Sequence, residues 1–232
     1  MSTTSTAIHA VLFDLDGTLL DTAPDLVLAL NTLLKHHDRP SVDVSKLRHL
    51  ASQGSIALTR YGFPDVNNAT QFEQLRQEFL QHYAESVCVD TEFFNGMESL
   101  LESIEAQHIP WGIVTNKPGD LTKALLEKLS LSDRPACVVS GDTLTVRKPH
   151  PEPLLFASEK IQLSPHHTIY LGDDPRDIYA GNAAGMYTCI AQYGYIEDDT
   201  DTDQWGADFT INHPLELLNH IQLSTPSHEM GT

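Results

Sequence analysis

The chain has 232 residues, of which 41% are hydrophobic and 20% are charged, and its formal net charge at pH 7 is -18. This composition is typical of a globular protein, and the length suits one domain or a core domain with a smaller insertion. The negative charge repels nucleic acids and anionic membranes, so neither is expected as a partner. No apolar run approaches the roughly 20 residues of a membrane-spanning helix. The N-terminal residues lack the pattern of a secretory signal, and we therefore expect a cytoplasmic protein.

The first predicted element is a buried strand within residues 8–15, followed by a long interval in which no strand pattern is convincing. That interval contains three helical patterns, at 24–36, 43–60 and 69–86. The first of them opens at Pro24, a favoured first helical position. A wholly helical insert after the first strand predicts a separate cap, residues 23–92. We expect its hinges at 21–24 and 90–96.

Strand and helix signals alternate from residue 93 onward. Short, continuous apolar runs lie at 111–115, 136–140, 168–172 and 187–191, and helical patterns lie at 97–107, 119–129 and 152–161. Continuous apolar strands are typical of a parallel sheet covered on both faces. The sequence therefore predicts an α/β fold with a doubly wound parallel sheet, a Rossmann-like core of residues 1–22 and 93–224. We expect residues 225–232 to form a disordered tail.

Cysteines and histidines give no metal site in the sequence. The three cysteines are far apart and form no C-x-x-C motif, so we expect them to be reduced, with Cys137 and Cys189 in buried strands and Cys88 elsewhere. Two pairs among the twelve histidines, 36–37 and 166–167, are adjacent in sequence. Adjacent side chains on a helix do not face one ligand shell, so surface or capping roles are predicted for them.

Polar side chains follow the predicted core strands where each strand ends. Because parallel strands present their carboxyl ends at one edge, these side chains should meet there. They are Asp14 and Asp16 after the first strand, Thr115 and Asn116 after the second, Lys148 after the third, and Asp173, Asp174 and Asp177 after the fourth.

Several carboxylates at one edge of a sheet would repel one another and raise their own pKa values unless a cation lay among them. Mg²⁺ suits such a place, because it takes a few carboxylates and keeps room for waters and a phosphate oxygen. A metal, a lysine and a hydroxyl are sufficient to position and stabilise a phosphoryl group in transfer. The sequence therefore predicts Mg²⁺-dependent phosphoryl-transfer chemistry, with a small phosphomonoester as the partner.

The runs at 14–19 (DLDGTL), 115–116 (TN), 148–149 (KP) and 172–174 (GDD), with Asp177, resemble the four motifs of the haloacid dehalogenase superfamily in order and spacing. The resemblance spans residues 10–193, and the helical insert is similar to the small cap of that superfamily. Residues 14–25 and 148–155 resemble the phosphoglycolate phosphatase family. The segments 140–144, 176–178, 193–196 and 205–208 are similar to its N-acetylmuramic acid 6-phosphate phosphatase branch, which serves bacterial cell-wall recycling.

The resemblance implies a role for each residue of the motifs. Asp14 would attack phosphorus and form an aspartyl-phosphate, and Asp16 would act as acid and then as base. Lys148 would offset the negative charge, while Thr115 and the Asn116 backbone would hold phosphate oxygens. The metal ligands would be Asp14, the backbone carbonyl of Asp16, and Asp173. Asp174 and Asp177 would support the metal.

Alternatives remain within this superfamily, because a fold does not fix a function. Asp16 argues against a dehalogenase, and the lack of membrane spans argues against an ion pump. A phosphomutase stays open, and a non-catalytic phosphate-binding module is disfavoured because none of the essential residues is missing. The sequence does not decide between a monomer and a homodimer. His150, in the Lys148 loop, is a weaker functional candidate.

Substrate choice is expected to lie in the cap, since phosphate contacts are common to all substrates. The cap loop offers Gln53, Gly54 and Ser55 as substrate-binding residues. Its sequence differs from the Gly-x-Gly-like loop expected of a true phosphoglycolate enzyme. We therefore favour N-acetylmuramic acid 6-phosphate over 2-phosphoglycolate as the substrate. Arg60 is either a surface residue or the partner of a substrate carboxylate.

Overall fold

The computed structural model describes residues 8–222, so the predicted tail at 225–232 lies outside the described residues. Its main sheet has six strands in the order β5-β4-β1-β6-β7-β8, and all neighbouring strands are parallel. The strands are β1 (Ala10–Phe13), β4 (Trp111–Val114), β5 (Cys137–Val139), β6 (Thr168–Gly172), β7 (Tyr187–Ala191) and β8 (Phe209–Ile211). The predicted α/β fold with a doubly wound parallel sheet is confirmed. Strand β8, only three residues long, was not predicted.

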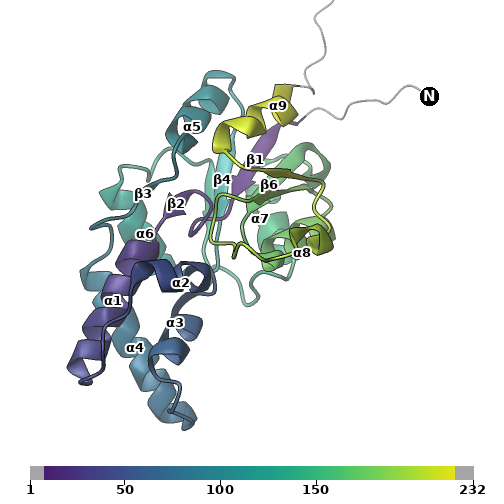
Figure 1. Cartoon of the computed structure of the whole chain (residues 1–232). Helices are drawn as coiled ribbons and strands as arrows, with labels where there is room; N and C mark the ends of the chain where they lie inside the picture. Colours follow the sequence, from purple (N-terminus) through teal and green to yellow (C-terminus); the bar gives the residue numbers. More distant parts are fainter. Residues whose placement is uncertain (1–7, 223–232) are drawn as a thin grey trace, which may run out of the picture.

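Helices cover both faces of this sheet. Helices α7 and α8 lie on one face, and α5, α6 and α9 lie on the other (Figure 1). They are α5 (Met97–Ala106), α6 (Gly119–Lys128), α7 (Glu152–Ile161), α8 (Pro175–Ala184) and α9 (Leu217–Gln222), with short 3₁₀ turns at Pro165–His167, Thr202–Trp205 and Pro214–Glu216. No helix within residues 8–222 is both long enough and apolar enough to cross a bilayer.

Strand β1 shows why the core strands are continuously apolar. Val11 and Phe13 point into the larger hydrophobic cluster, whereas Leu12 points into the cluster beneath α7 and α8. All three side chains are fully buried. Since alternate residues of a strand face opposite sides, a strand covered on both sides needs apolar residues at every position.

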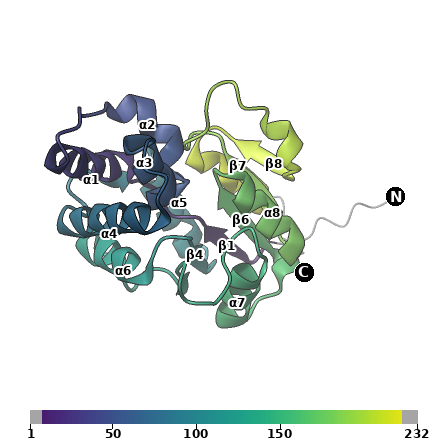
Figure 2. The same cartoon turned by 90° about the horizontal axis from the view of Figure 1, so that it is seen from below.

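Four helices follow β1 before the core resumes. They are α1 (Ala23–His36), α2 (Val44–Ala51), α3 (Gly54–Gly62) and α4 (Ala69–Glu85), and they lie together at one end of the sheet (Figures 1 and 2). The prediction of one helix over 43–60 was wrong, because the chain breaks at Ser52 and restarts at Gly54, whose φ is +71°. That break forms the loop between α2 and α3, which reaches toward the core.

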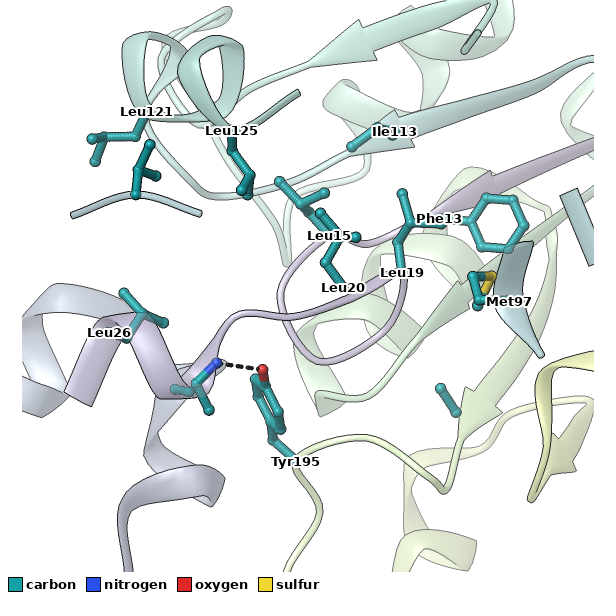
Figure 3. Close-up of a cluster of buried hydrophobic side chains, with 14 of the residues drawn as sticks. Phe13, Leu15, Leu19, Leu20, Leu26, Met97, Ile113, Leu121, Leu125 and Tyr195 are labelled. Atoms are coloured by element: carbon teal, nitrogen blue, oxygen red, sulfur yellow. Dashed lines mark hydrogen bonds between the residues drawn. The ribbon is translucent and has the colours of Figure 1, made fainter. Parts of the chain in front are cut away.

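A two-stranded antiparallel ribbon lies where the chain leaves and re-enters the core. It pairs β2 (Leu20–Asp21) with β3 (Glu92–Phe93), and β3 corrects the expectation of no strand in the insert. The Tyr195 hydroxyl accepts a hydrogen bond from the Ala23 N–H at 2.8 Å (Figure 3). The same hydroxyl donates to Asp21 Oδ1 at 2.9 Å. Both predicted hinges thus meet here, while the division into core and cap after residues 22 and 92 stays a prediction.

The cysteines are free thiols. Cys189 is buried in β7, as predicted. Cys137 lies in β5 but is only half-buried, which corrects the prediction, because β5 is an edge strand with one neighbour. Burial nevertheless raises the pKa of Cys137 to about 11. This thiol therefore stays protonated at neutral pH and is a poor nucleophile.

Candidate active site

The predicted polar residues meet at the carboxyl ends of β1, β4 and β6. Asp14 directly follows β1, Thr115 follows β4, and Asp173 follows β6. The loop after β5 brings Lys148 to the same place, where the Lys148 Nζ lies 2.7 Å from Asp14 Oδ1. In the mostly polar turn after β1, Leu15 is buried in the same hydrophobic cluster as Leu20 and Ile113 (Figure 3).

Lys148 is the positive centre of the site. Its Nζ donates hydrogen bonds to Asp14 Oδ1, Asp177 Oδ1 and the Tyr170 hydroxyl oxygen, each at 2.7 Å. The residue is 4% exposed. Burial alone would lower the pKa of Lys148, but the charges of Asp14 and Asp177 outweigh it and raise the pKa above the usual value. The ammonium group therefore stays charged beside Asp14.

Three carboxylates lie close together at this end of the sheet, and we call Asp14, Asp173 and Asp177 the acidic cluster. Asp14, Asp173 and Asp177 each offer an oxygen, and these atoms lie within 4.8 Å of one another. Burial raises the pKa of Asp14 to about 8, with Lys148 opposing the shift and the two other aspartates adding to it. Burial, and then Asp177, raise the pKa of Asp173 to about 7. Such a group of hard oxygen donors, short of positive charge, fits Mg²⁺.

Asp173 is held from three directions. It accepts hydrogen bonds from the Thr18 hydroxyl at 2.9 Å, the Tyr195 N–H at 3.0 Å and the Ser52 hydroxyl at 2.6 Å. Gly17 allows this approach, because its φ is +88° and a Cβ there would overlap the Asp173 carboxylate. Since Ser52 belongs to the loop between α2 and α3, the helical insert contacts the acidic cluster directly.

Asp16 has different partners from Asp14. Its Oδ1 accepts hydrogen bonds from Lys117 Nζ at 2.8 Å and from the Thr22 hydroxyl at 2.6 Å. Neither partner belongs to the acidic cluster, so the Asp16 carboxylate has its own set of contacts. The prediction for Asp16 at the metal concerns its backbone carbonyl and stays a prediction.

Lys117 was missed in the sequence, where its only signal is its place two residues after Thr115 in the loop that follows β4. Its Nζ also donates to the Tyr83 hydroxyl of α4 at 2.9 Å. Burial lowers the pKa of Lys117, but Asp16 and Tyr83 outweigh it and the net shift is upward. Burial raises the pKa of Tyr83 to about 12. Lys117 therefore stays charged and bridges Asp16 of the core and Tyr83 of the helical insert.

Asp174 and Asp177 differ in their surroundings. They form a reciprocal capping box at the start of α8, in which each side chain accepts a hydrogen bond from the backbone near the other. Both oxygens of Asp174 also accept from the Arg176 guanidinium, at 2.7 and 2.8 Å. Asp174 is therefore engaged by a helix end and a cation, whereas Asp177 lies in the acidic cluster with Lys148. Asp177 is therefore in a position to support a metal ion at the acidic cluster, whereas Asp174 is not part of that cluster, and the roles of both residues at a metal stay predictions.

Asn116 positions the Lys148 loop with its side chain. Its Nδ2 donates to the Lys148 carbonyl oxygen at 3.0 Å, and its Oδ1 accepts from the Lys148 N–H at 3.1 Å. Thr115 is buried beside it, with its Oγ1 accepting from the Lys117 N–H at 3.2 Å. The roles of Thr115 and the Asn116 backbone toward phosphate stay predictions, although both residues line the cavity described next.

A cavity of about 350 Å³ lies between the sheet edge and the helical insert. Pockets for small molecules typically have roughly 300–1,000 Å³. The core lines it with Asp14, Asp16, Lys117, Lys148 and Asp177, among others, and the insert lines it with Gln53, Gly54, Ser55, Arg76 and Tyr83, among others. The three predicted cap-loop residues are therefore in reach of a ligand, and their role in binding stays a prediction.

Arg76, rather than Arg60, is the cap arginine in this cavity. Arg60 donates to the Val66 carbonyl oxygen at 2.5 Å and lies over the Phe72 ring. It is exposed and does not line the cavity, which agrees with its interpretation as a surface residue and gives no support to a pairing with a substrate carboxylate. The Arg76 Nη1 lies 3.3 Å from the Ser55 Oγ at the cavity wall. His150 is exposed and does not line the cavity, which gives no support to its candidacy.

The sequence of this chain is similar to those of known proteins. A model of the haloacid dehalogenase-like hydrolases matches residues 11–191. The N-acetylmuramic acid 6-phosphate phosphatase of Pseudomonas putida is 40% identical over 92% of this chain and 96% of its own. The phosphoglycolate phosphatase of Xanthomonas campestris pv. campestris is 41% identical over 90% of this chain and 94% of its own.

The fold of this chain is also similar to that of a solved structure. The crystal structure of a predicted phosphoglycolate phosphatase from Haemophilus somnus superposes with a TM-score of 0.81 and 25% identity, covering 91% of this chain and 97% of that one. The family model, the curated relatives and the solved structure therefore match over most of the chain. The chain belongs to the haloacid dehalogenase-like hydrolase family, and it is a phosphatase of that family.

Proposed function

We propose that this phosphatase is Mg²⁺-dependent, works through an aspartyl-phosphate on Asp14, and hydrolyses N-acetylmuramic acid 6-phosphate. The observation that carries the reaction is the contact between the Asp14 carboxylate and the Lys148 ammonium group, 2.7 Å apart and next to Asp173 and Asp177. A carboxylate in that position is a nucleophile whose negative charge is offset on one side and whose other oxygen remains for phosphorus.

In the first half of the reaction, an Asp14 oxygen forms a bond to phosphorus while the bond from phosphorus to the ester oxygen breaks. The leaving oxygen takes a proton from Asp16, which lines the same cavity. Lys148 stays charged and stabilises the negative charge around the phosphoryl group. Thr115 and the Asn116 backbone would hold phosphoryl oxygens at the end of β4.

In the second half, Asp16 takes a proton from water, and the oxygen of that water attacks phosphorus and releases Asp14. The Lys117 ammonium group and the Thr22 hydroxyl keep the Asp16 carboxylate oriented, at 2.8 and 2.6 Å. Hydrolysis regenerates both aspartates in their starting protonation states. A phosphomutase would instead return the phosphoryl group to a sugar, which remains the competing reaction.

Mg²⁺, when bound by Asp14, Asp173 and the Asp16 carbonyl, would supply positive charge to the phosphoryl oxygens. The acidic cluster supports this proposal, because the charge of Lys148 offsets only one of the three buried carboxylates and the remaining negative charge favours a further cation. Asp177 would orient Lys148 and lie next to the metal ligands, and the helix cap at Asp174 would hold Asp177 in place.

The chemistry of the cavity supports an amino-sugar acid as the substrate. The lining from the insert includes Ile56, Phe79 and Leu80. The Arg76 guanidinium pairs with Glu73 through Nε and Nη2, at 2.8 and 2.7 Å, and its Nη1, next to Ser55 at the cavity, would bind a substrate carboxylate. A two-carbon acid would leave most of the apolar lining in contact with water. An acetylated sugar with a lactyl ether has two methyl groups to cover that lining and a carboxylate for Arg76.

The alternative substrate is 2-phosphoglycolate. It too carries a carboxylate that Arg76 could bind, and relatives of equal similarity bear the name of either enzyme. The two substrates therefore differ mainly in the apolar and hydroxyl contacts that the cap makes. Gln53 and Ser55 are proposed to bind sugar hydroxyls, contacts that a glycolate would not use.

A side-by-side measurement of kcat/KM for N-acetylmuramic acid 6-phosphate and 2-phosphoglycolate tests the substrate. We expect the amino-sugar acid to be preferred at least tenfold, and a preference for 2-phosphoglycolate would establish the alternative. Hydrolysis of p-nitrophenyl phosphate in a chelator, with and without added Mg²⁺, tests the metal separately. Activity that survives the chelator unchanged would contradict the Mg²⁺ proposal whichever substrate is preferred.

A further inference from the structure

A second cluster of metal-ligating side chains lies in the helical insert, apart from the aspartates. It joins His36, the last residue of α1, to Glu78 and His82 of α4. Each of the three offers a ligand atom within 4.8 Å of the other two. It could not be predicted from the sequence, because His36 and Glu78 lie on two helices that are far apart in the chain and meet only in the folded structure.

The cluster is centred on the Glu78 carboxylate. His36 Nδ1 and His82 Nε2 each lie 3.9 Å from Glu78 Oε1. The rings of His36 and His82 are in edge contact, with centroids 4.8 Å apart. His37 Nε2 lies 3.0 Å from the other oxygen, Oε2. Glu78 and His82 are four residues apart on one helix and therefore share a face, so the backbone already holds two of the ligands side by side.

His82 provides an independent sign of a missing ligand. Its side chain is 11% exposed, and its Nε2 is shielded from solvent without a hydrogen-bond partner among residues 8–222. On the other side of the ring, Nδ1 lies 3.6 Å from Glu85 Oε2. This distance is beyond a direct hydrogen bond, but the negative charge of Glu85 beside Nδ1 favours a proton on that nitrogen and leaves Nε2 to bind an ion. A buried polar atom with no partner is unfavourable, and a cation would satisfy it.

We propose that His36, Glu78 and His82 form a site for a divalent transition metal such as Zn²⁺. Two imidazoles and one carboxylate are ligands that Zn²⁺ takes readily, whereas Mg²⁺ prefers oxygen ligands alone. The site is therefore chemically distinct from the acidic cluster of the core. His37 is adjacent to the site and competes for Glu78 Oε2. A bound ion would cross-link the end of α1 to α4 and stabilise the insert.

Metal titration of the untagged chain, in Mg²⁺ sufficient to saturate the core site, tests the proposal. Co²⁺ is the spectroscopic probe, because a site with nitrogen ligands gives stronger visible absorption than an all-oxygen site. Zn²⁺ is then titrated by calorimetry. We expect the wild-type chain to bind one equivalent of Zn²⁺ that displaces the Co²⁺ signal. The variants His36→Gln and His82→Gln should bind at least tenfold more weakly.

The matched control is His49→Gln, which removes an imidazole from α2 that pairs with Glu197 at 3.2 Å instead of with this cluster. It should bind Co²⁺ and Zn²⁺ as the wild type does. His36 is 56% exposed, so its replacement is compatible with folding even if that of His82 is not. Equal affinity in wild type and His36→Gln, or no binding in wild type at concentrations up to a millimolar, would overturn the proposal.

Discussion

Asp14 and Asp16 stand two residues apart and have different surroundings. Asp14 contacts Lys148 and the acidic cluster, whereas Asp16 contacts Lys117 and Thr22. Different surroundings allow two carboxylates to have different roles in one reaction, because the partners of each carboxylate set its orientation and its protonation. The proposed nucleophile and the proposed acid–base group are thus distinguishable by substitution.

The variant Asp14→Asn removes the proposed nucleophile with little change of shape. We expect kcat for p-nitrophenyl phosphate to fall about 1,000-fold or more, equal to roughly 4 kcal/mol of activation free energy. Folding should be retained, because the substitution removes one of three mutually repelling carboxylates. Circular dichroism is the control for folding. A kcat within about tenfold of wild type would refute the assignment of Asp14.

The variant Lys117→Met leaves the carboxylate of Asp16 without its ion-pair partner. We expect a loss of at least tenfold in kcat for an alkyl phosphate ester, and a smaller loss for p-nitrophenyl phosphate, whose leaving group needs little protonation. Tyr83→Phe is the matched variant, because it removes only the hydrogen bond from Lys117 to α4. Equal losses on both substrates would mean that Lys117 does not act through Asp16.

At the scale of elements, the helical insert reaches the core through a loop and a helix. In the loop between α2 and α3, the Ser52 hydroxyl donates a hydrogen bond to Asp173. The Ser52 backbone carbonyl oxygen accepts a hydrogen bond from the Arg176 guanidinium at 2.8 Å. Helix α4 packs against α1 and α3 within the insert (Figures 1 and 2) and contributes Arg76 and Tyr83 to the cavity. These contacts join the helical insert to the core around the cavity, so we expect substrate specificity to depend on α4 and this loop.

Arg76→Met tests the role of α4 in recognising a substrate carboxylate. We expect KM for carboxylate-bearing phosphate esters to rise at least tenfold, with KM for p-nitrophenyl phosphate changed by less than threefold, because only the former esters carry the group that Arg76 binds. Arg60→Met is the matched control, since Arg60 lies over Phe72 and does not line the cavity. Equal effects of Arg76→Met on both kinds of substrate would contradict the proposed contact.

At the scale of the whole molecule, the buried acids link stability to pH and metal. The pKa values of Asp14 and Asp173, about 8 and about 7, lie above their ordinary value of 3.8. The native state therefore binds more protons than the unfolded state across this interval. The free energy of unfolding of the metal-free chain should fall as pH rises from about 4 to about 8 on account of these groups.

Added Mg²⁺ should reverse this loss. We expect the increase in Tm caused by Mg²⁺ to be larger at pH 8 than at pH 5.5, because the ion binds the deprotonated carboxylates and stabilises the native state by mass action. Differential scanning calorimetry at both pH values measures it. The variant Asp173→Asn should show a smaller increase at pH 8. A pH-independent increase in Tm would contradict a site made of these acids.

The core and its motifs were predictable because local patterns specify them. Continuous apolar runs such as that at Ala10–Phe13 are typical of strands covered on both faces, and side chains that follow parallel strands must share one edge. The ribbon of β2 and β3 and the strand β8 were missed, because two or three residues carry too little periodicity to predict a strand. The helix break at Ser52 was also missed, since one glycine in a helical pattern does not by itself end a helix.

The sequence by itself determined the fold class, the family resemblance and the set of motif residues, because these depend on local pattern and spacing. Only the tertiary structure decided which residues are partners. Lys117 donates a hydrogen bond to Asp16, and the rings of His36 and His82 are in contact. Arg76 lines the cavity, whereas Arg60 does not. No sequence motif connects the residues of these pairs. Contacts between distant segments depend on how helices pack and which way their faces turn, and a linear pattern does not contain that information.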